Sequence, residues 1–226
     1  MSNIVSVFDL EVTIDPAKEF VRKIAQNLED ERIYTVDFVT LEPLLQEKDN
    51  EEWKKQMKSM DLLIPGGGSV LGTEKTMDKT LGREIENRVF PKLLLRFLQK
   101  NKKTIYLLAE SEEALLVFEK GLRVYGQNIR IIGRSVLQDN KLEKDYIIND
   151  INGLEPDCIF SALPSPMQEE FIYENKTLLN ARVWVGCGKK FIEEKKNIRI
   201  KNRVRLFILK KIFHYQLERQ TNEDEK

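Results

Sequence analysis

Short runs of β-branched and other apolar residues alternate along the chain with longer stretches in which apolar residues recur at every third or fourth position. The short runs predict strands, and the longer stretches predict amphipathic helices. Because strands separated by helices form βαβ units, the pattern predicts an α/β fold with a mainly parallel sheet flanked by helices. The predicted strands cover residues 4–8, 33–36, 62–64, 104–108, 129–132, 158–161 and 183–185.

Three helices are predicted from their spacing alone. Their apolar positions are Phe20, Ile24 and Leu28; Leu115, Phe118 and Leu122; and Ile147, Ile148 and Ile151. Two helix starts are predicted where a capping side chain precedes proline or acids, at Asp15 and at Ser111. Ligands of parallel sheets usually bind at the carboxyl ends of strands, so we expect any chemistry in the loops that follow residues 36, 64, 108, 132, 161 and 185.

Composition narrows the class of protein. The chain has 226 residues, of which 41% are hydrophobic and 33% charged, and 37 Lys or Arg balance 37 Asp or Glu. The apolar content argues against intrinsic disorder, and the zero net charge gives no electrostatic case for a nucleic-acid partner. No apolar run approaches the roughly 20 residues of a membrane span, and the first residues lack the pattern of a secretory signal. Two cysteines are too few for a disulfide scaffold or a structural zinc site, so we expect a soluble, cytosolic protein.

An asymmetry of charge divides the chain. Residues 189–219 contain eleven Lys or Arg and three Glu, a net charge of +8, so the rest of the chain is acidic. We therefore predict one domain over residues 1–188, a basic helical C-terminal appendage over 189–220, and disordered residues 221–226. Such a helix can lie on an anionic membrane surface or dock on its own domain, and the sequence leaves both alternatives open. The residues that can share its apolar face are Val204, Phe207, Ile208, Ile212 and either Phe213 or Tyr215.

Three glycines follow a predicted strand at residues 66–68. Glycine lets a ligand approach the backbone closely, so the N–H groups of this loop could hold a diphosphate. No Gly-Lys-Ser/Thr follows, and the spacing does not fit the dinucleotide fingerprint. A simple turn is an equally good interpretation of these residues. The hypothesis of a nucleotide-dependent enzyme of another class has this loop as its only support.

Residues 163–170, with the sequence LPSPMQEE, follow a predicted strand and begin a helix. A helix N-terminus at the carboxyl end of a strand is suited to bind an anion. Gln168 offers both a hydrogen-bond donor and an acceptor to a sugar or a base. The alternative interpretation is a well-capped helix with no ligand.

The same segment resembles part of a known family. Residues 157–172 resemble the G-x-P-x-Q-E-x-W/F-I signature of the WecG/TagA/CpsF glycosyltransferase family. Further pieces of the family pattern follow its order along nearly the whole chain, at residues 34–37, 60–67, 88–89, 105–108, 131–133, 147–152 and 185–188. The basic tail resembles the C-terminal appendage of the family.

The resemblance implies a Rossmann-like fold and an inverting transfer of an N-acetylmannosamine-type sugar from a UDP donor to a polyprenyl-diphosphate-linked sugar. It implies no metal or other cofactor, and a peripheral position at the cytoplasmic face of the cell membrane, where cell-surface polysaccharide is assembled and the basic tail contacts the anionic surface. Carried over by position, the donor site would comprise Pro166, Gln168, Glu169, Gly186 and Gly188. The acceptor would be bordered by Thr35, Asp37, Gly66 and Gly67, and its diphosphate by Arg88, Arg203 and Arg205.

One departure from the family pattern bears on catalysis. Gly66 stands where the family has an acid, yet the transfer needs a general base to take the proton of the acceptor hydroxyl. Thr35 and Asp37 are the predicted catalytic residues, with Asp37 as the substitute base. The alternative for Asp37 is a strand-end capping acid, the commoner role. The departure also fits a catalytically silent relative that binds a nucleotide sugar or acts as a scaffold, and homo-oligomer formation stays open.

Overall fold

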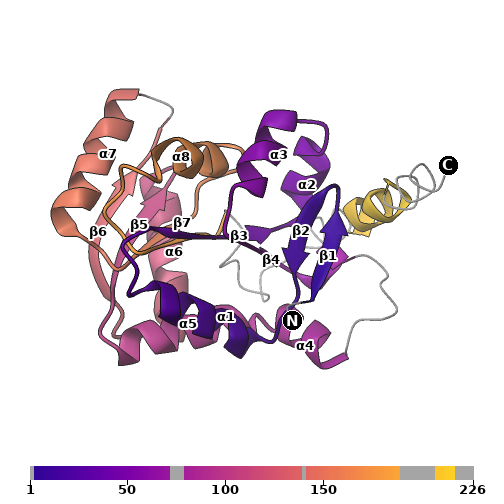
Figure 1. The fold of residues 1–226 in the computed structure, drawn as a ribbon, viewed down its shortest axis with the longest axis horizontal. Helices are drawn as coiled ribbons and strands as arrows, with labels where there is room; N and C mark the ends of the chain where they lie inside the picture. Colours follow the sequence, from indigo (N-terminus) through magenta and orange to yellow (C-terminus); the bar gives the residue numbers. More distant parts are fainter. Residues whose placement is uncertain (1–2, 72–78, 139–140, 189–206, 217–226) are drawn as a thin grey trace.

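The computed structural model describes residues 3–71, 79–138, 141–188 and 207–216 of the chain. Within these residues, six parallel strands form one sheet in the order β4-β3-β8-β7-β5-β6 (Figure 1). The prediction of a Rossmann-like α/β fold is therefore confirmed. The strands are β3 (Tyr34–Val39), β4 (Leu62–Pro65), β5 (Thr104–Ala109), β6 (Arg130–Val136), β7 (Cys158–Ser161) and β8 (Val183–Gly186).

Helices cover both faces of this sheet (Figure 1). One face packs against α1 (Ala17–Asn27), α5 (Val89–Lys100) and α6 (Glu112–Tyr125). The other packs against α2 (Leu41–Glu47), α3 (Glu51–Lys58), α7 (Lys141–Leu154) and α8 (Met167–Asn175). A single 3-10 turn, η1 (Gly68–Leu71), and α4 (Lys79–Glu86) lie between β4 and α5.

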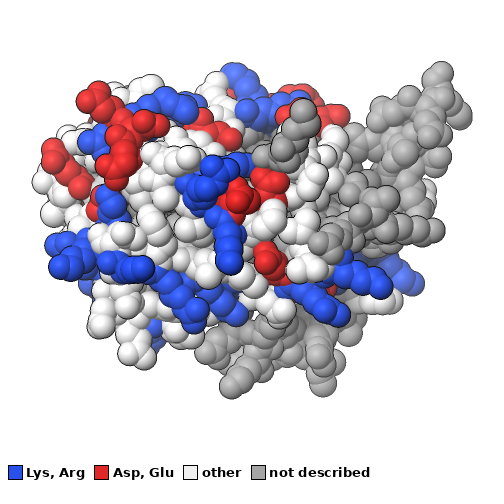
Figure 2. Space-filling model, turned by 60° about the horizontal axis from the view of Figure 1, so that its bottom comes forward, with Lys and Arg blue, Asp and Glu red and all other residues white. Residues whose placement is uncertain are grey.

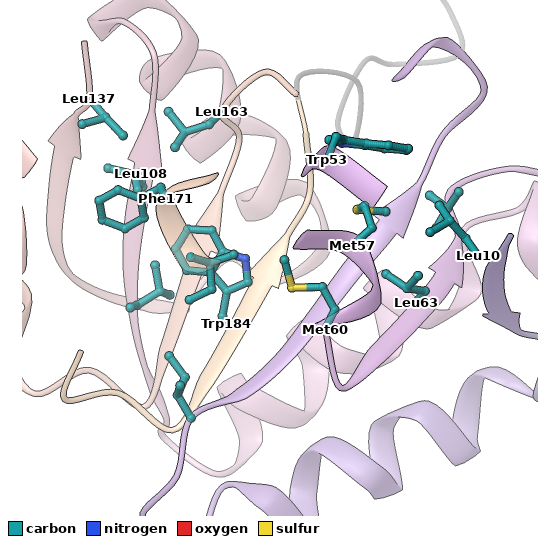
Figure 3. Close-up of a cluster of buried hydrophobic side chains, with 14 of the residues drawn as sticks. Leu10, Trp53, Met57, Met60, Leu63, Leu108, Leu137, Leu163, Phe171 and Trp184 are labelled. Atoms are coloured by element: carbon teal, nitrogen blue, oxygen red, sulfur yellow. The ribbon is translucent and has the colours of Figure 1, made fainter. Parts of the chain in front are cut away.

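Alternation along the strands divides the core between the two faces, because successive side chains of a strand point to opposite sides. On β8, Val183 and Val185 pack toward α1 and α5, whereas Trp184 packs toward α3 and α8. Trp184 stacks on Phe171 with ring centroids 5.8 Å apart. Figure 3 shows the cluster to which Trp184 and Phe171 belong, and Trp53 and Met57 of α3 are part of it.

The predicted first strand is only half of what forms there. Residues 3–13 make an antiparallel hairpin of β1 (Ile4–Val7) and β2 (Leu10–Thr13), which stands outside the main sheet. The two turn residues, Phe8 and Asp9, both have positive φ angles, of 47° and 64°, as a two-residue hairpin turn requires. Neither residue is a glycine or an asparagine, so the sequence lacked the usual signal for this turn.

The C-terminal helix of residues 207–216 docks on this hairpin. Phe213 is fully buried and meets Phe8 edge to face, with ring centroids 5.6 Å apart, and Leu209 packs beside it. Of the predicted apolar face within the described residues, Phe213 alone is docked, since Phe207, Ile208 and Ile212 are all exposed. Docking on the same chain is thus observed, while contact of the tail with a membrane stays a prediction. The rest of the predicted appendage lies outside the described residues.

Replacing Phe213 with alanine is expected to release this helix from the hairpin. Burial of a phenylalanine supplies most of the apolar contact here, and its truncation costs about 3 kcal/mol or more in a packed core. Amide hydrogen exchange in residues 207–216 should then accelerate at least tenfold, and Tyr215→Ala, at an exposed position of the same helix, should leave it unchanged. Equal protection in Phe213→Ala and the unaltered chain would show that the observed packing does not hold the helix.

The surface carries charges of both signs. Figure 2 brings forward the side on which α1 and α5 lie, with basic side chains along its lower edges and acidic ones at its upper left and near its centre. No helix among the described residues has the length and apolar character needed to cross a bilayer. The same residues contain no group of three or more His, Cys, Asp or Glu side chains placed to hold a metal ion.

Candidate active site

Three strands end side by side at the carboxyl edge of the sheet and bring distant parts of the sequence together. In the strand register, Asp37 of β3 lies opposite Gly186 of β8, and Gly186 lies opposite Ser161 of β7. Helix α8 begins at Met167, shortly after β7, with Pro166 at its N-cap position and Glu169 and Glu170 in its first turn. The prediction that residues 163–170 form a helix start at a strand end is confirmed, and this edge is where ligands of parallel sheets bind.

A buried hydrogen-bonded chain runs across this edge. The side-chain amide of Gln168 donates to both carboxylate oxygens of Asp37, with nitrogen–oxygen distances of 3.1 Å. The backbone N–H of Gly188 donates in turn to Oε1 of Gln168 at 3.1 Å. Gly188 has a φ angle of 63°, in the region that favours glycine. The side chains of Asp37 and Gln168 are only 1% and 2% exposed. Through the hydrogen bond from Gly188 to Gln168, this buried pair holds the backbone that follows β8.

Asp37 lies within β3, not after it as predicted, because the strand runs on to Val39. Burial raises the pKa of Asp37 well above its usual value, and the nearby charge of Glu169 raises it further. The hydrogen bonds from Gln168 and from the backbone of Phe38 oppose that rise in pKa. Asp37 therefore keeps a proton more readily than an exposed aspartate does.

Glu169 is a second buried carboxyl group beside the first. It is 3% exposed, and its Oε2 has no hydrogen-bond partner. Burial raises the pKa of Glu169 to about 7, although hydrogen bonds from its own backbone, Ser165 and Trp53 act in the opposite direction. Trp53 also donates from Nε1 to Ser165 Oγ at 2.9 Å, which fixes the loop that precedes α8.

Two cavities open at this edge. The first, which we call the Gln168 cavity, has a volume of about 430 Å³ and polar groups from Ser165, Gln168 and Glu169 in its wall. The second, the Arg88 cavity, has a volume of about 250 Å³ and lies on the other side of β3, over α1 and α5. Its wall is largely apolar, with Phe20, Phe38 and Phe90, and it includes Arg88. The residues that line both cavities are Phe38, Thr40, Glu42 and Cys187.

The structure places six of the twelve predicted site residues in the walls of these cavities. Gly66, Gly67 and Arg88 line the Arg88 cavity, and Gln168, Glu169 and Gly188 line the Gln168 cavity. Pro166 caps α8, and Gly186 lies under the side chains of Asp37 and Gln168. Arg203 and Arg205 lie outside the described residues.

Thr35 is placed elsewhere. Its backbone N–H and its hydroxyl both donate to Asp61 Oδ2, at 2.9 and 2.8 Å, at the amino end of β3 and β4. Asp61 also pairs with Arg32 at 2.8 Å. Thr35 therefore joins two strands at the end of the sheet opposite the cavities, and neither cavity includes it.

Three residues at the cavities were missed from the sequence. The sequence did not single out Trp53, Glu42 or Ser165 as site residues. Glu42 had one usable signal, since it follows closely on a strand that the sequence predicted to end at this edge. Ser165 lies inside the signature segment, and its observed hydrogen bonds with Trp53 and Glu169 give it a role.

The fold and its paired cavities define the class: an α/β protein with two adjoining cavities at the carboxyl edge of a parallel sheet. A sequence model described as the "Glycosyl transferase WecG/TagA/CpsF family" matches residues 5–192, and the chain belongs to this family.

Two curated relatives share one name, N-acetylglucosaminyldiphosphoundecaprenol N-acetyl-beta-D-mannosaminyltransferase. The protein from Bacillus subtilis (strain 168) is 28% identical over 137 residues, which cover 60% of this chain and 52% of the relative. The protein from Bacillus spizizenii (strain ATCC 23059 / NRRL B-14472 / W23) is 29% identical over 144 residues, which cover 63% and 54% respectively. The chain thus spans about half the length of these relatives.

Proposed function

We propose that this protein transfers an N-acetylmannosamine-type sugar from a UDP-linked donor to a polyprenyl-diphosphate-linked sugar, with inversion at the anomeric carbon. The observation that carries the proposal is the pair of cavities that adjoin at one sheet edge and share one wall. A transferase must hold two substrates with their reacting atoms in contact, and such a pair of cavities suits that need. The name of the relatives supports N-acetylglucosamine as the acceptor sugar.

We assign the donor to the Gln168 cavity. Its volume of about 430 Å³ falls within the range of small-molecule sites, and its polar groups come from rigid elements. Glu169, with a pKa of about 7, is protonated in a large fraction of molecules at neutral pH. A protonated carboxyl with an unpartnered oxygen can donate a hydrogen bond to a phosphate or carbonyl oxygen of the donor.

We assign the lipid-linked acceptor to the Arg88 cavity. Its aromatic wall suits an apolar chain, and the guanidinium of Arg88 suits a diphosphate, which arginine can bind through two parallel hydrogen bonds. A peripheral position at the membrane follows from this assignment. The basic residues of 189–219 and the exposed Phe207 and Ile208 support contact with an anionic lipid surface.

Arg88→Gln is expected to raise the KM for the acceptor about tenfold or more, because one charge-assisted hydrogen bond contributes about 1.5 kcal/mol or more. The dissociation constant of UDP should stay within twofold, since the two cavities lie on opposite sides of β3. Steady-state kinetics with a short-chain acceptor and calorimetry with UDP measure the two effects. A rise confined to UDP would reverse the assignment of the cavities.

A second candidate function is the binding of a nucleotide sugar without transfer, as in a catalytically silent relative. It is favoured by Gly66, which carries no acid, and by Asp37, which lines neither cavity. The deciding experiment incubates the full chain with UDP-sugars and a short polyprenyl-diphosphate-linked N-acetylglucosamine, and follows both UDP release and the glycosylated lipid. The proposed function predicts acceptor-dependent transfer from an N-acetylmannosamine donor. UDP binding by thermal shift without transfer would establish the silent relative instead.

A further inference from the structure

The wall between the two cavities offers a single carboxylate. Phe38, Thr40, Glu42 and Cys187 line both cavities, and only Glu42 among them carries a carboxyl group. Burial raises the pKa of the Cys187 thiol well above its usual value, so Cys187 stays protonated. Phe38 has no titratable group, and the hydroxyl of Thr40 is not a base.

Each of the other carboxyl groups at the cavities lines only one of them. In the Arg88 cavity, Asp15 accepts from Lys23 Nζ at 2.9 Å and from the backbone of Asn3 at 3.2 Å. Glu84 in the same cavity accepts from the backbone N–H of Ala17 at 2.8 Å, at the start of α1. Glu169 lines the Gln168 cavity and does not line the Arg88 cavity.

The turn that carries Glu42 also explains why an acid is absent at position 66. The backbone N–H of Gly66 donates to the carbonyl of Val39 at 2.7 Å. A Cβ atom at Gly66 would lie 2.5 Å from Thr40 Cγ2 and 3.0 Å from that carbonyl oxygen. Val39 and Thr40 are therefore packed against Gly66, so a side chain at position 66 would require Thr40 to shift. The same turn brings the Glu42 carboxylate to the shared wall.

We propose that Glu42 is the general base of the transfer reaction, acting where the two cavities meet. This assignment rests on the proposed function. The acceptor hydroxyl oxygen bonds to the anomeric carbon of the donor as the bond from that carbon to the diphosphate breaks. The Glu42 carboxylate takes the hydroxyl proton, and the electron pair of the broken bond leaves with UDP. Glu42 later returns its proton to water, and no atom changes oxidation state overall.

The position of Glu42 suits this step better than that of Asp37. Asp37 is 1% exposed and lines neither cavity, so a substrate hydroxyl has no access to it. We therefore regard Asp37 as a positioning residue that holds Gln168 and, through it, Gly188. Glu42 is only partly buried and belongs to the first turn of α2, on the backbone that follows β3.

The test compares Glu42→Gln with Glu47→Gln in the full chain, using the transfer assay above. Glu47 lies on the same helix, lines neither cavity and accepts from Asn50, so its variant controls for a change of charge on α2. Loss of a general base should lower kcat about 100-fold to 10,000-fold in Glu42→Gln, with the affinity for UDP within twofold of the unaltered chain. Glu47→Gln should keep kcat within threefold.

Two further variants keep the test decisive if glutamine disturbs folding. Glu42→Asp should retain more activity than Glu42→Gln, and formate should restore part of kcat in Glu42→Ala but not in Glu47→Gln. A kcat in Glu42→Gln within threefold of the unaltered chain would overturn the assignment while leaving the function intact. An unaltered chain that binds UDP but never transfers would overturn the function, and the base assignment with it.

Discussion

Replacing Gly186 with alanine is expected to lower the free energy of unfolding by about 3 kcal/mol, at the upper end for an extra methyl group in a packed core. A Cβ atom there would overlap Asp37 Oδ2 and come within 2.7 Å of both Asp37 Cγ and Gln168 Nε2. These neighbours cannot retreat easily, because both are buried and hydrogen-bonded to each other. The variant must either move β8 or break the contact between Asp37 and Gln168.

The consequence reaches beyond stability. Gln168 holds the backbone N–H of Gly188, so its displacement alters the wall of the Gln168 cavity and should weaken UDP binding about tenfold or more, the cost of one lost buried hydrogen bond. Urea unfolding and UDP calorimetry on the same samples measure both effects. Gly153→Ala is the matched control, since a Cβ there meets nothing within 4 Å and lies on helix α7. If Gly186→Ala and Gly153→Ala were equally stable, the close packing at Gly186 would be refuted.

Replacing Glu169 with glutamine is expected to raise the free energy of unfolding at pH 8 by about 3 kcal/mol, the equivalent of the shift in its pKa from 4.5 to about 7. Between these pH values the folded protein keeps the proton that the unfolded chain has lost. The stability of the unaltered chain therefore falls as pH rises from 4.5 to 7, and it stays low above pH 7. Asp37, whose pKa is also raised by burial, contributes in the same direction.

Glutamine at position 169 carries no charge, so this part of the pH dependence should disappear. Urea unfolding at pH 5, 6, 7 and 8 measures the trend, and Glu170→Gln, at the exposed neighbouring position, should reproduce the unaltered curve. If Glu169 contacts the donor as proposed, the stabilised variant also binds UDP more weakly. A Glu169→Gln curve parallel to that of the unaltered chain would show that Glu169 is not the buried group that the pKa implies.

Much of the fold could be predicted from hydrophobic periodicity. The strand at residues 158–161 was predicted with its observed bounds, and Ser111 caps α6 by accepting from the backbone of Ala114 at 3.2 Å. Strand ends were less accurate where an apolar pattern continues through a polar residue. Asp37 interrupts the run of β3, and it can do so because Gln168 satisfies its carboxylate, a partner 131 positions away in the sequence.

The candidate site could be predicted only in part, because its contacts also join residues that lie far apart in the sequence. The signature segment located Gln168 and Glu169, because a helix start after a strand is a local pattern. Which carboxylate faces the cavities depends on how β3, β4 and β8 pack, and no local pattern reports that packing. Thr35 and Asp37 lie two residues apart on β3, yet the first holds Asp61 at one end of the sheet and the second holds Gln168 near the other.

The central claim is that the donor occupies the Gln168 cavity and the acceptor the Arg88 cavity, with Glu42 between them. A crystal structure of the full chain with UDP tests the donor half of this claim directly. We expect the nucleotide beside Ser165, Gln168 and Glu169, with its terminal phosphate directed toward Glu42. UDP against Phe20 and Arg88, or outside both cavities, would contradict the account.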